Sequence, residues 1–284
     1  MSSKKGILVV SYGSSYKESR EKSIGEIEGA IAKAFPEYRV YRAFTSEPII
    51  ERIKKKEGVE TDTISQALER MMTDGIREIT IIQTHLVKGV RYEALTETVK
   101  AYQKDFDNIN IEEPILTVQK NVEAFADVLE MIGVSYDDGK TAICYVGHGI
   151  EETSSAVYDQ LQKVLNLRGC QHYYIGTLSV KPTLQDIKQV IVETGCYRRV
   201  VILPLMLVSG YHVRKDLIGR KSDSWKNTFL QEGFEVECVT KGLGEFSEIQ
   251  NIFAEHLKSV TTPVLLPGKS HGRRSLAGCS PWGR

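Results

Sequence analysis

The chain has 284 residues, and its 37 Lys and Arg side chains balance 37 Asp and Glu side chains, so its formal net charge is zero. This balance excludes the basic excess of most nucleic-acid-binding proteins and the acidic excess of disordered solubilising segments. An apolar fraction of 41% and a charged fraction of 26% are typical of a folded, soluble protein. The length fits two domains or one large one.

The zero net charge is the sum of two unequal parts. Residues 263–284 contain four basic side chains and no acidic one, which leaves 33 basic against 37 acidic side chains on residues 1–262. The same segment holds three of the eight prolines and has no periodic apolar pattern. We predict a disordered tail over 263–284 that takes no part in function. A basic arm that binds nucleic acid is the weaker alternative, because four charges release few counterions.

Cysteine usage and hydropathy predict a cytoplasmic protein without membrane contact. No apolar run approaches the ~18 residues that span a bilayer, and the first residues lead directly into a strand pattern rather than a signal peptide. The five cysteines are widely spaced and form no C-x-x-C motif, so neither a disulfide framework nor a cysteine zinc site is expected.

Short apolar runs alternate with amphipathic helical patterns along the whole chain. Such alternation predicts parallel sheets with helices on both faces, an α/β fold. The predicted strands, in chain order, are 7–11, 38–44, 79–83, a segment within 109–118, 141–146, 172–177, 199–203 and 234–239. The predicted helices cover about 24–31, 63–75, 122–132, 157–164, 184–195 and 247–260.

The two halves of the chain repeat three short motifs in the same order. ILVVSYG at 7–13 matches ICYVGHG at 143–149, TSEP at 45–48 matches SVKP at 179–182, and IQTHLVKG at 82–89 matches LPLMLVSG at 203–210. We infer an internal duplication that gives two similar Rossmann-like domains, 1–138 and 139–246, with a cleft between them. Ligands of such sheets bind at the carboxyl ends of the strands.

Two histidines follow corresponding strands of the second half. His148 lies between Gly147 and Gly149 at the end of one strand, and His212 ends the segment LVSGYH after another. Neutral imidazole binds Co, Ni, Fe and Zn ions and is the usual base near neutral pH, so the pair is a candidate metal site. The alternative is that both are hydrogen-bonded loop residues. His85 is better explained as a packing residue, because Met206 occupies the matching position.

Several polar residues are placed to bind an anionic ligand beside the histidines. The turn after the first strand, with Ser11, Ser14 and Ser15, resembles a helix-terminal carboxylate or phosphate site but lacks a dinucleotide or P-loop motif. Glu93 is a candidate carboxylate near the cleft, or else a solvated helix residue. The four cations that follow the matching strands form what we call the basic rim: Lys88, Arg91, Arg214 and Lys215.

Taken together, these motifs resemble the class II tetrapyrrole metal chelatases, and within them the sirohydrochlorin cobaltochelatases of the anaerobic cobalamin pathway. The resemblance extends over about residues 6–260, and the matching stretches are 8–16, 42–46, 146–149, 204–212, 223–226 and 242–245. It implies two similar α/β domains, with the last helix (247–260) packed back on the first, and ATP-independent insertion of Co²⁺ into sirohydrochlorin with release of two protons. It also implies no permanently bound cofactor, and it leaves a homo-oligomer possible.

In such a chelatase His148 and His212 would be metal ligands, and His148 would also take protons from the macrocycle. The resemblance further implies an acidic third ligand, but two acidic positions of the family hold Arg91 and Ser179 here. Glu93 is the remaining candidate for that ligand, and Arg91 is a candidate for gripping a substrate carboxylate.

Three alternatives stay open at this point. The same fold could insert Fe²⁺ or Ni²⁺, because imidazole ligands do not separate these ions from Co²⁺. The missing carboxylates are also compatible with a non-catalytic carrier of tetrapyrrole or metal. An unrelated nucleotide-binding α/β protein is disfavoured because no phosphate-binding loop is present.

Overall fold

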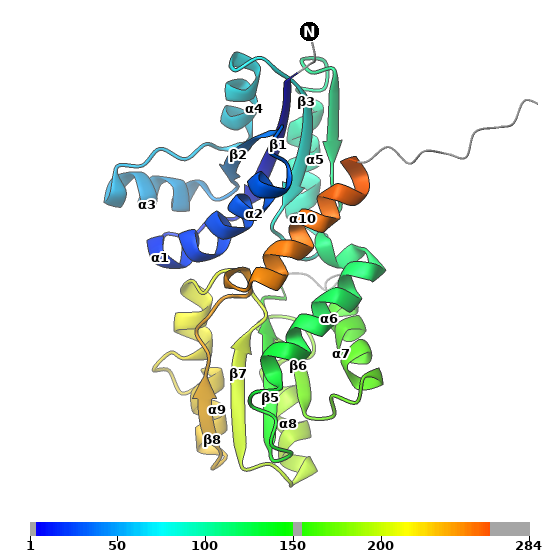
Figure 1. Cartoon of the computed structure of the whole chain (residues 1–284). Coiled ribbons are helices and arrows are strands. Elements are labelled where there is room, and N and C mark those ends of the chain that lie inside the picture. Colours follow the sequence, from blue (N-terminus) through cyan, green and yellow to red (C-terminus); the bar gives the residue numbers. More distant parts are fainter. Residues whose placement is uncertain (1–3, 150–154, 262–284) are drawn as a thin grey trace, which may run out of the picture.

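The computed structural model describes residues 4–149 and 155–261, and in this part of the chain β-strands and helices alternate as predicted (Figure 1). The strands are β1 (Lys4–Ser11), β2 (Arg39–Phe44), β3 (Ile76–Gln83), β4 (Asn108–Ile111), β5 (Thr141–Gly147), β6 (Tyr173–Thr177), β7 (Arg199–Pro204) and β8 (Glu235–Cys238). The α-helices are α1 (Lys17–Arg20), α2 (Glu26–Ala34), α3 (Glu47–Glu57), α4 (Ile64–Thr73), α5 (Val90–Lys100), α6 (Gln119–Gly133), α7 (Ser155–Leu167), α8 (Leu184–Thr194), α9 (Trp225–Gln231) and α10 (Ser247–Thr261).

The strands form two parallel sheets of identical topology. The first has the order β2-β1-β3-β4 and the second the order β6-β5-β7-β8, so each strand of one half has a counterpart in the other. This repeated order confirms the predicted α/β fold and agrees with the inferred duplication. The long helices α3 and α5 were missed as elements, since their apolar positions are few.

Each sheet is covered on both faces because successive residues of a strand point to opposite sides. Along β1, Ile7 and Val9 pack towards α2, α6 and α10, whereas Leu8 and Val10 pack towards α4 and α5. Along β5, odd positions face α6 and α7, and even positions face α8 and α9. Buried apolar side chains on both faces explain why these strands are continuous apolar runs in the sequence.

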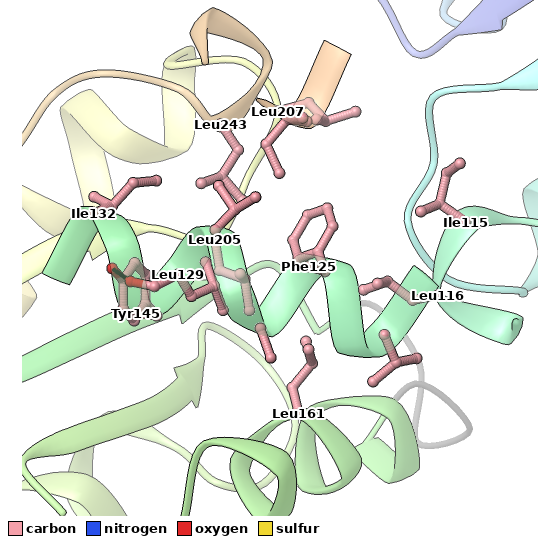
Figure 2. Close-up of a cluster of buried hydrophobic side chains, with 14 of the residues drawn as sticks. Ile115, Leu116, Phe125, Leu129, Ile132, Tyr145, Leu161, Leu205, Leu207 and Leu243 are labelled. Carbon is pink, nitrogen blue, oxygen red and sulfur yellow. Dashed lines mark hydrogen bonds between the residues drawn. The ribbon is translucent and has the colours of Figure 1, made fainter. Parts of the chain in front are cut away.

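Helix α6 packs on the second sheet, although the sequence placed residues 119–133 in a first domain ending at 138. Phe125 and Leu129 project from α6 into a cluster with Tyr145, Leu161 and Leu205 (Figure 2). The hydroxyl of Tyr145 donates a hydrogen bond of 2.6 Å to the carbonyl oxygen of Leu129. The same cluster also includes Ile7 and Val9 of the first sheet, so the domain boundary at 138 stays a prediction.

Helix α10 returns from the second half of the chain and lies against α2 and α6 (Figure 1). His256 anchors it, because Nε2 donates to the carbonyl oxygen of Glu113 at 3.1 Å and Nδ1 accepts from the amide of Asn121 at 2.9 Å. His256 is thus a buried structural residue. The tail predicted over 263–284 lies outside the described residues. No helix in 4–149 or 155–261 is long and apolar enough to cross a membrane.

Candidate functional site

A cleft of about 730 Å³ lies where the carboxyl ends of the two sheets face each other. Its walls come from the turn after β1, the segment after β3, the residue pair after β5 and the segment after β7, so both halves contribute. The two halves approach each other closely here, since a Cβ atom added to Gly210 would lie 3.7 Å from Oγ of Ser14. The cleft is therefore where strand-end residues of both sheets can reach one ligand.

His148 and His212 converge in this cleft. Their ring centroids are 4.3 Å apart and their planes are inclined at 78°, so the two imidazoles meet edge to face. The turn that presents His148 requires glycine, because Gly149 has φ of +63° and a Cβ there would lie 2.5 Å from Oγ1 of Thr177. The pairing predicted from strand positions is thus present in the fold.

Asp216 fixes the orientation of His212. Nδ1 of His212 lies 2.8 Å from Oδ2 of Asp216, and a carboxylate only accepts, so Nδ1 carries the proton. The lone pair is then on Nε2, the nitrogen that is available to an ion. A carboxylate behind a metal-binding histidine is a common arrangement, because it sets the tautomer and raises the basicity of the imidazole.

His148 is held in its neutral form by its surroundings. Burial, together with the smaller effects of the neighbouring His212 and Arg91, lowers its pKa from 6.5 to about 4, whereas Asp216 opposes the shift. Its Nδ1 is buried without a hydrogen-bond partner among the described residues. A neutral imidazole with an unsatisfied nitrogen is suited to binding a metal ion or accepting a proton.

Of the residues predicted to bind the substrate, four line the cleft: Ser14, Ser15, Lys88 and Arg91. Lys88 also forms an ion pair of 3.1 Å with Glu113 at the edge of the cleft. The guanidinium carbon of Arg91 lies 4.2 Å from the centroid of the Tyr12 ring, a cation–π contact that orients it.

Three predicted residues are not in the cleft wall. Ser11 is fully buried and accepts a hydrogen bond of 2.9 Å from Thr84, so it joins two strand ends and does not reach a ligand. Arg214 lies over the ring of Tyr16, 4.7 Å from its centroid, on the exposed side. Glu93 is exposed on α5 and does not line the cleft.

The described residues therefore do not place at the site the acidic third ligand that the resemblance implies. Among residues 4–149 and 155–261, no group of three or more His, Cys, Asp or Glu side chains is arranged to hold a metal ion. The prediction that Glu93 joins His148 and His212 at a metal is thus not supported by its position.

His85 lies in the cleft wall although the sequence indicated a packing position. Both ring nitrogens are buried without a hydrogen-bond partner among the described residues. Burial lowers its pKa to about 4, with a smaller contribution from the charge of Arg91. The residue is thus a buried imidazole at the edge of the cleft. The signal for this position in the sequence was that a polar His85 stands where the second half has the apolar Met206.

Sequence reasoning missed the aromatic part of the site. Tyr12 and Tyr211 line the cleft with 43% and 54% of their surface exposed, which offers flat apolar area to a ligand. Arg52 of α3 adds a third cation to the lining. Asp216 was also missed, although the spacing of four residues from His212 on a helical turn was a usable signal.

Comparison with known proteins places this site in a family. A family model described as cobalt chelatase (CbiK) matches residues 5–262. The chain belongs to the cobalt chelatase (CbiK) family. This membership confirms the predicted resemblance and identifies a metal chelatase, and residues 263–284 lie entirely beyond the match.

Two relatives of this family member are named sirohydrochlorin cobaltochelatase. The protein from Salmonella typhimurium is 28% identical over 254 residues, covering 89% of this chain and 95% of its own. The protein from Nitratidesulfovibrio vulgaris, named CbiKC, is 26% identical over 263 residues, covering 92% of each chain.

Solved structures share the fold. The sirohydrochlorin chelatase SirB from Bacillus subtilis subspecies spizizenii, solved in complex with cobalt, superposes with a TM-score of 0.60 at 15% identity, covering 90% of this chain and 94% of that one. CbiX, described as the terminal enzyme of sirohaem biosynthesis in denitrifying bacteria, gives 0.55 at 14% identity, covering 90% of this chain and 100% of that one. Both likenesses establish the two-sheet architecture.

Proposed function

We propose that this chelatase inserts Co²⁺ into sirohydrochlorin in the cytoplasm, without nucleotide hydrolysis and within the anaerobic cobalamin pathway. The single observation that carries the proposal is the facing pair His148 and His212 in a cleft with cationic walls. The names of the two relatives, which cover most of this chain, give the substrate and the metal. The ion and the macrocycle are both substrates, and the chain needs no resident cofactor.

The chemistry divides between the two histidines and the walls. The imidazoles would hold the incoming ion through nitrogen, with Asp216 keeping Nε2 of His212 unprotonated. Insertion forms bonds from the ring nitrogens to the metal and releases two pyrrole protons. Neutral His148 would accept a proton from the macrocycle, and protons then pass to solvent.

Binding of the macrocycle relies on charge and on flat apolar surface. Sirohydrochlorin carries eight carboxylates. Lys88 and Arg91 would form ion pairs with them, and backbone N–H groups near Ser14 and Ser15 would donate hydrogen bonds to them. Arg214, which is exposed and lies over the ring of Tyr16, would contribute a further positive charge. The tyrosines of the cleft wall would contact the ring itself.

The test monitors metal insertion by absorbance. Purified protein and metal-free sirohydrochlorin are mixed with Co²⁺, Fe²⁺ or Ni²⁺ in parallel assays. We expect insertion of Co²⁺, and a loss of at least about 100-fold in His148→Ala and in His212→Ala. His172→Ala is the matched control, because His172 bonds to Tyr197 away from the cleft. Activity with Fe²⁺ but not Co²⁺ would overturn the choice of metal, and near-normal turnover by His148→Ala would overturn its role.

One observation favours a second candidate, a carrier that binds tetrapyrrole or metal without inserting it. Among the described residues, no group of three or more His, Cys, Asp or Glu side chains is arranged to hold a metal ion at the site. Spectral titration separates the two functions, since a carrier would bind sirohydrochlorin under saturating Co²⁺ and leave it without metal.

A further inference from the structure

In the part of the chain that the structure describes, the walls of the cleft carry positive charge and no negative charge. Among the described residues that line it, Arg52, Lys88 and Arg91 are cationic, and there is no Asp or Glu. The ion pair with Glu113 offsets Lys88, and Asp216 lies behind His212. The empty cleft therefore attracts a polyanion and opposes a divalent cation, because charges in such a concave, partly dry site are weakly screened.

Arg91 is the cation that acts on the histidine pair. The contact with Tyr12, 4.2 Å from guanidinium carbon to ring centroid, holds it on the cleft wall. It lines the same cleft as His148, His212 and His85, so its charge faces the space in which an ion would be held. No described carboxylate forms an ion pair with Arg91. A positive charge in the same cleft repels a divalent ion at the histidine pair, because Coulomb repulsion grows with the charge of the ion.

A carboxylate of the macrocycle would reverse this effect. Arginine binds carboxylates in a bidentate geometry that matches its planar guanidinium, and the pair is neutral. The remaining carboxylates of an octa-anionic ring would then make the cleft negative. The ion would meet two imidazoles and a negative field only when the tetrapyrrole is already in place.

We propose that Arg91 makes retention of Co²⁺ by His148 and His212 conditional on a bound tetrapyrrole. The macrocycle binds first, one of its carboxylates neutralises Arg91, and the ion is then held. This order rests on the proposed function. Arg91 is a positioning residue here, since it acts on the ion through the substrate carboxylate and through electrostatic potential.

The first experiment measures Co²⁺ binding to the protein alone by calorimetry. Arg91→Gln should bind Co²⁺ about tenfold more tightly than wild type, and Arg91→Glu more tightly still. Arg91→Lys keeps the charge and should bind as weakly as wild type. Arg198→Gln removes an exposed arginine elsewhere and is the matched control. Circular dichroism checks that each variant is folded. Equal Co²⁺ affinity of wild type, Arg91→Gln and Arg91→Glu would overturn the proposal.

The second experiment is a chase over a single turnover. Protein preincubated with Co²⁺ is mixed with sirohydrochlorin plus excess EDTA, and protein preincubated with sirohydrochlorin is mixed with Co²⁺. Wild type should give product only in the second order, whereas Arg91→Gln should also give a burst in the first. A burst from wild type in the first order would contradict the proposal. Absence of product in both orders would instead refute the chelatase function, and the calorimetric comparison would still decide the role of Arg91.

Discussion

The carboxylate of Asp216 accepts a hydrogen bond from Nδ1 of His212 at 2.8 Å, one helical turn along the chain. Asp216→Asn replaces the acceptor by an amide that can present N–H, so the preferred tautomer of His212 is lost. We expect kcat/KM for Co²⁺ to fall by about 10–100-fold, with a larger rise in KM for the metal than for the tetrapyrrole. Steady-state assays with Asp159→Asn, an exposed site on α7, give the control. Equal effects on the KM values of both substrates would argue for a general structural defect.

The protonation of His148 should occur well below neutral pH. Its pKa of about 4, set mainly by burial, means that folded protein keeps it neutral between pH 6.5 and pH 4, where an unfolded chain protonates its histidines. This part of the stability is therefore present above pH 6.5 and is lost as pH falls through 4. NMR titration of the ring protons should show a midpoint near pH 4, which rises in Arg91→Gln. A midpoint at 6.5 would contradict the effect of burial and neighbouring charge on His148.

Glu112, which lies near His256 of α10, gives the free energy of unfolding a second dependence on pH. Its carboxylate lies 4.0 Å from Nε2 of His256. Only 5% of the residue is exposed, and this burial raises the pKa of the carboxyl group from 4.5 to about 7. The contribution of this group to stability is complete below pH 4.5 and is lost as pH rises through 7. Glu112→Gln should raise the free energy of unfolding by about 1–3 kcal/mol at pH 8, and by less at pH 5.

Urea denaturation at both pH values measures this difference. Glu26→Gln, which removes an exposed carboxylate from α2, is the matched control and should change neither value. A gain in Glu112→Gln that is the same at pH 5 and pH 8 would show that ionisation of Glu112 is not its cause.

Glu93→Ala should leave insertion activity within about twofold of wild type, because the side chain is exposed on α5 and does not line the cleft. Parallel assays of Co²⁺ insertion with Glu93→Ala and His148→Ala compare an exposed carboxylate with a residue of the pair. A hundredfold loss in Glu93→Ala would show that α5 moves to bring this carboxylate to the metal.

Removal of residues 263–284 should leave activity within about twofold, because this segment lacks an apolar pattern and the family match ends at residue 262. Far-ultraviolet circular dichroism and the insertion assay on the shortened protein are the measurements. Loss of folding on truncation would show that the tail is structural.

The sequence was sufficient for the architecture because local patterns carry it. Continuous apolar runs such as 7–10 and 143–146 can only be buried on both faces, which requires helices on both sides of a parallel sheet. The repeated motifs gave the duplication, and strand-end positions brought His148 and His212 together. The boundary at 138 stays a prediction, because buried residues of α6 belong to one cluster with Tyr145 of the second sheet and Ile7 of the first.

The net charge of zero and its division between residues 1–262 and the tail follow from the sequence alone, as do the alternation of strands and helices and the histidine pair. The tertiary structure decided which charges act on that pair. Arg91 and Glu93 are two residues apart in the chain, yet one lines the cleft and the other is exposed, because helical residues two apart point in different directions. Burial and three-dimensional distance, which set electrostatic effects, are properties of the fold and not of sequence spacing.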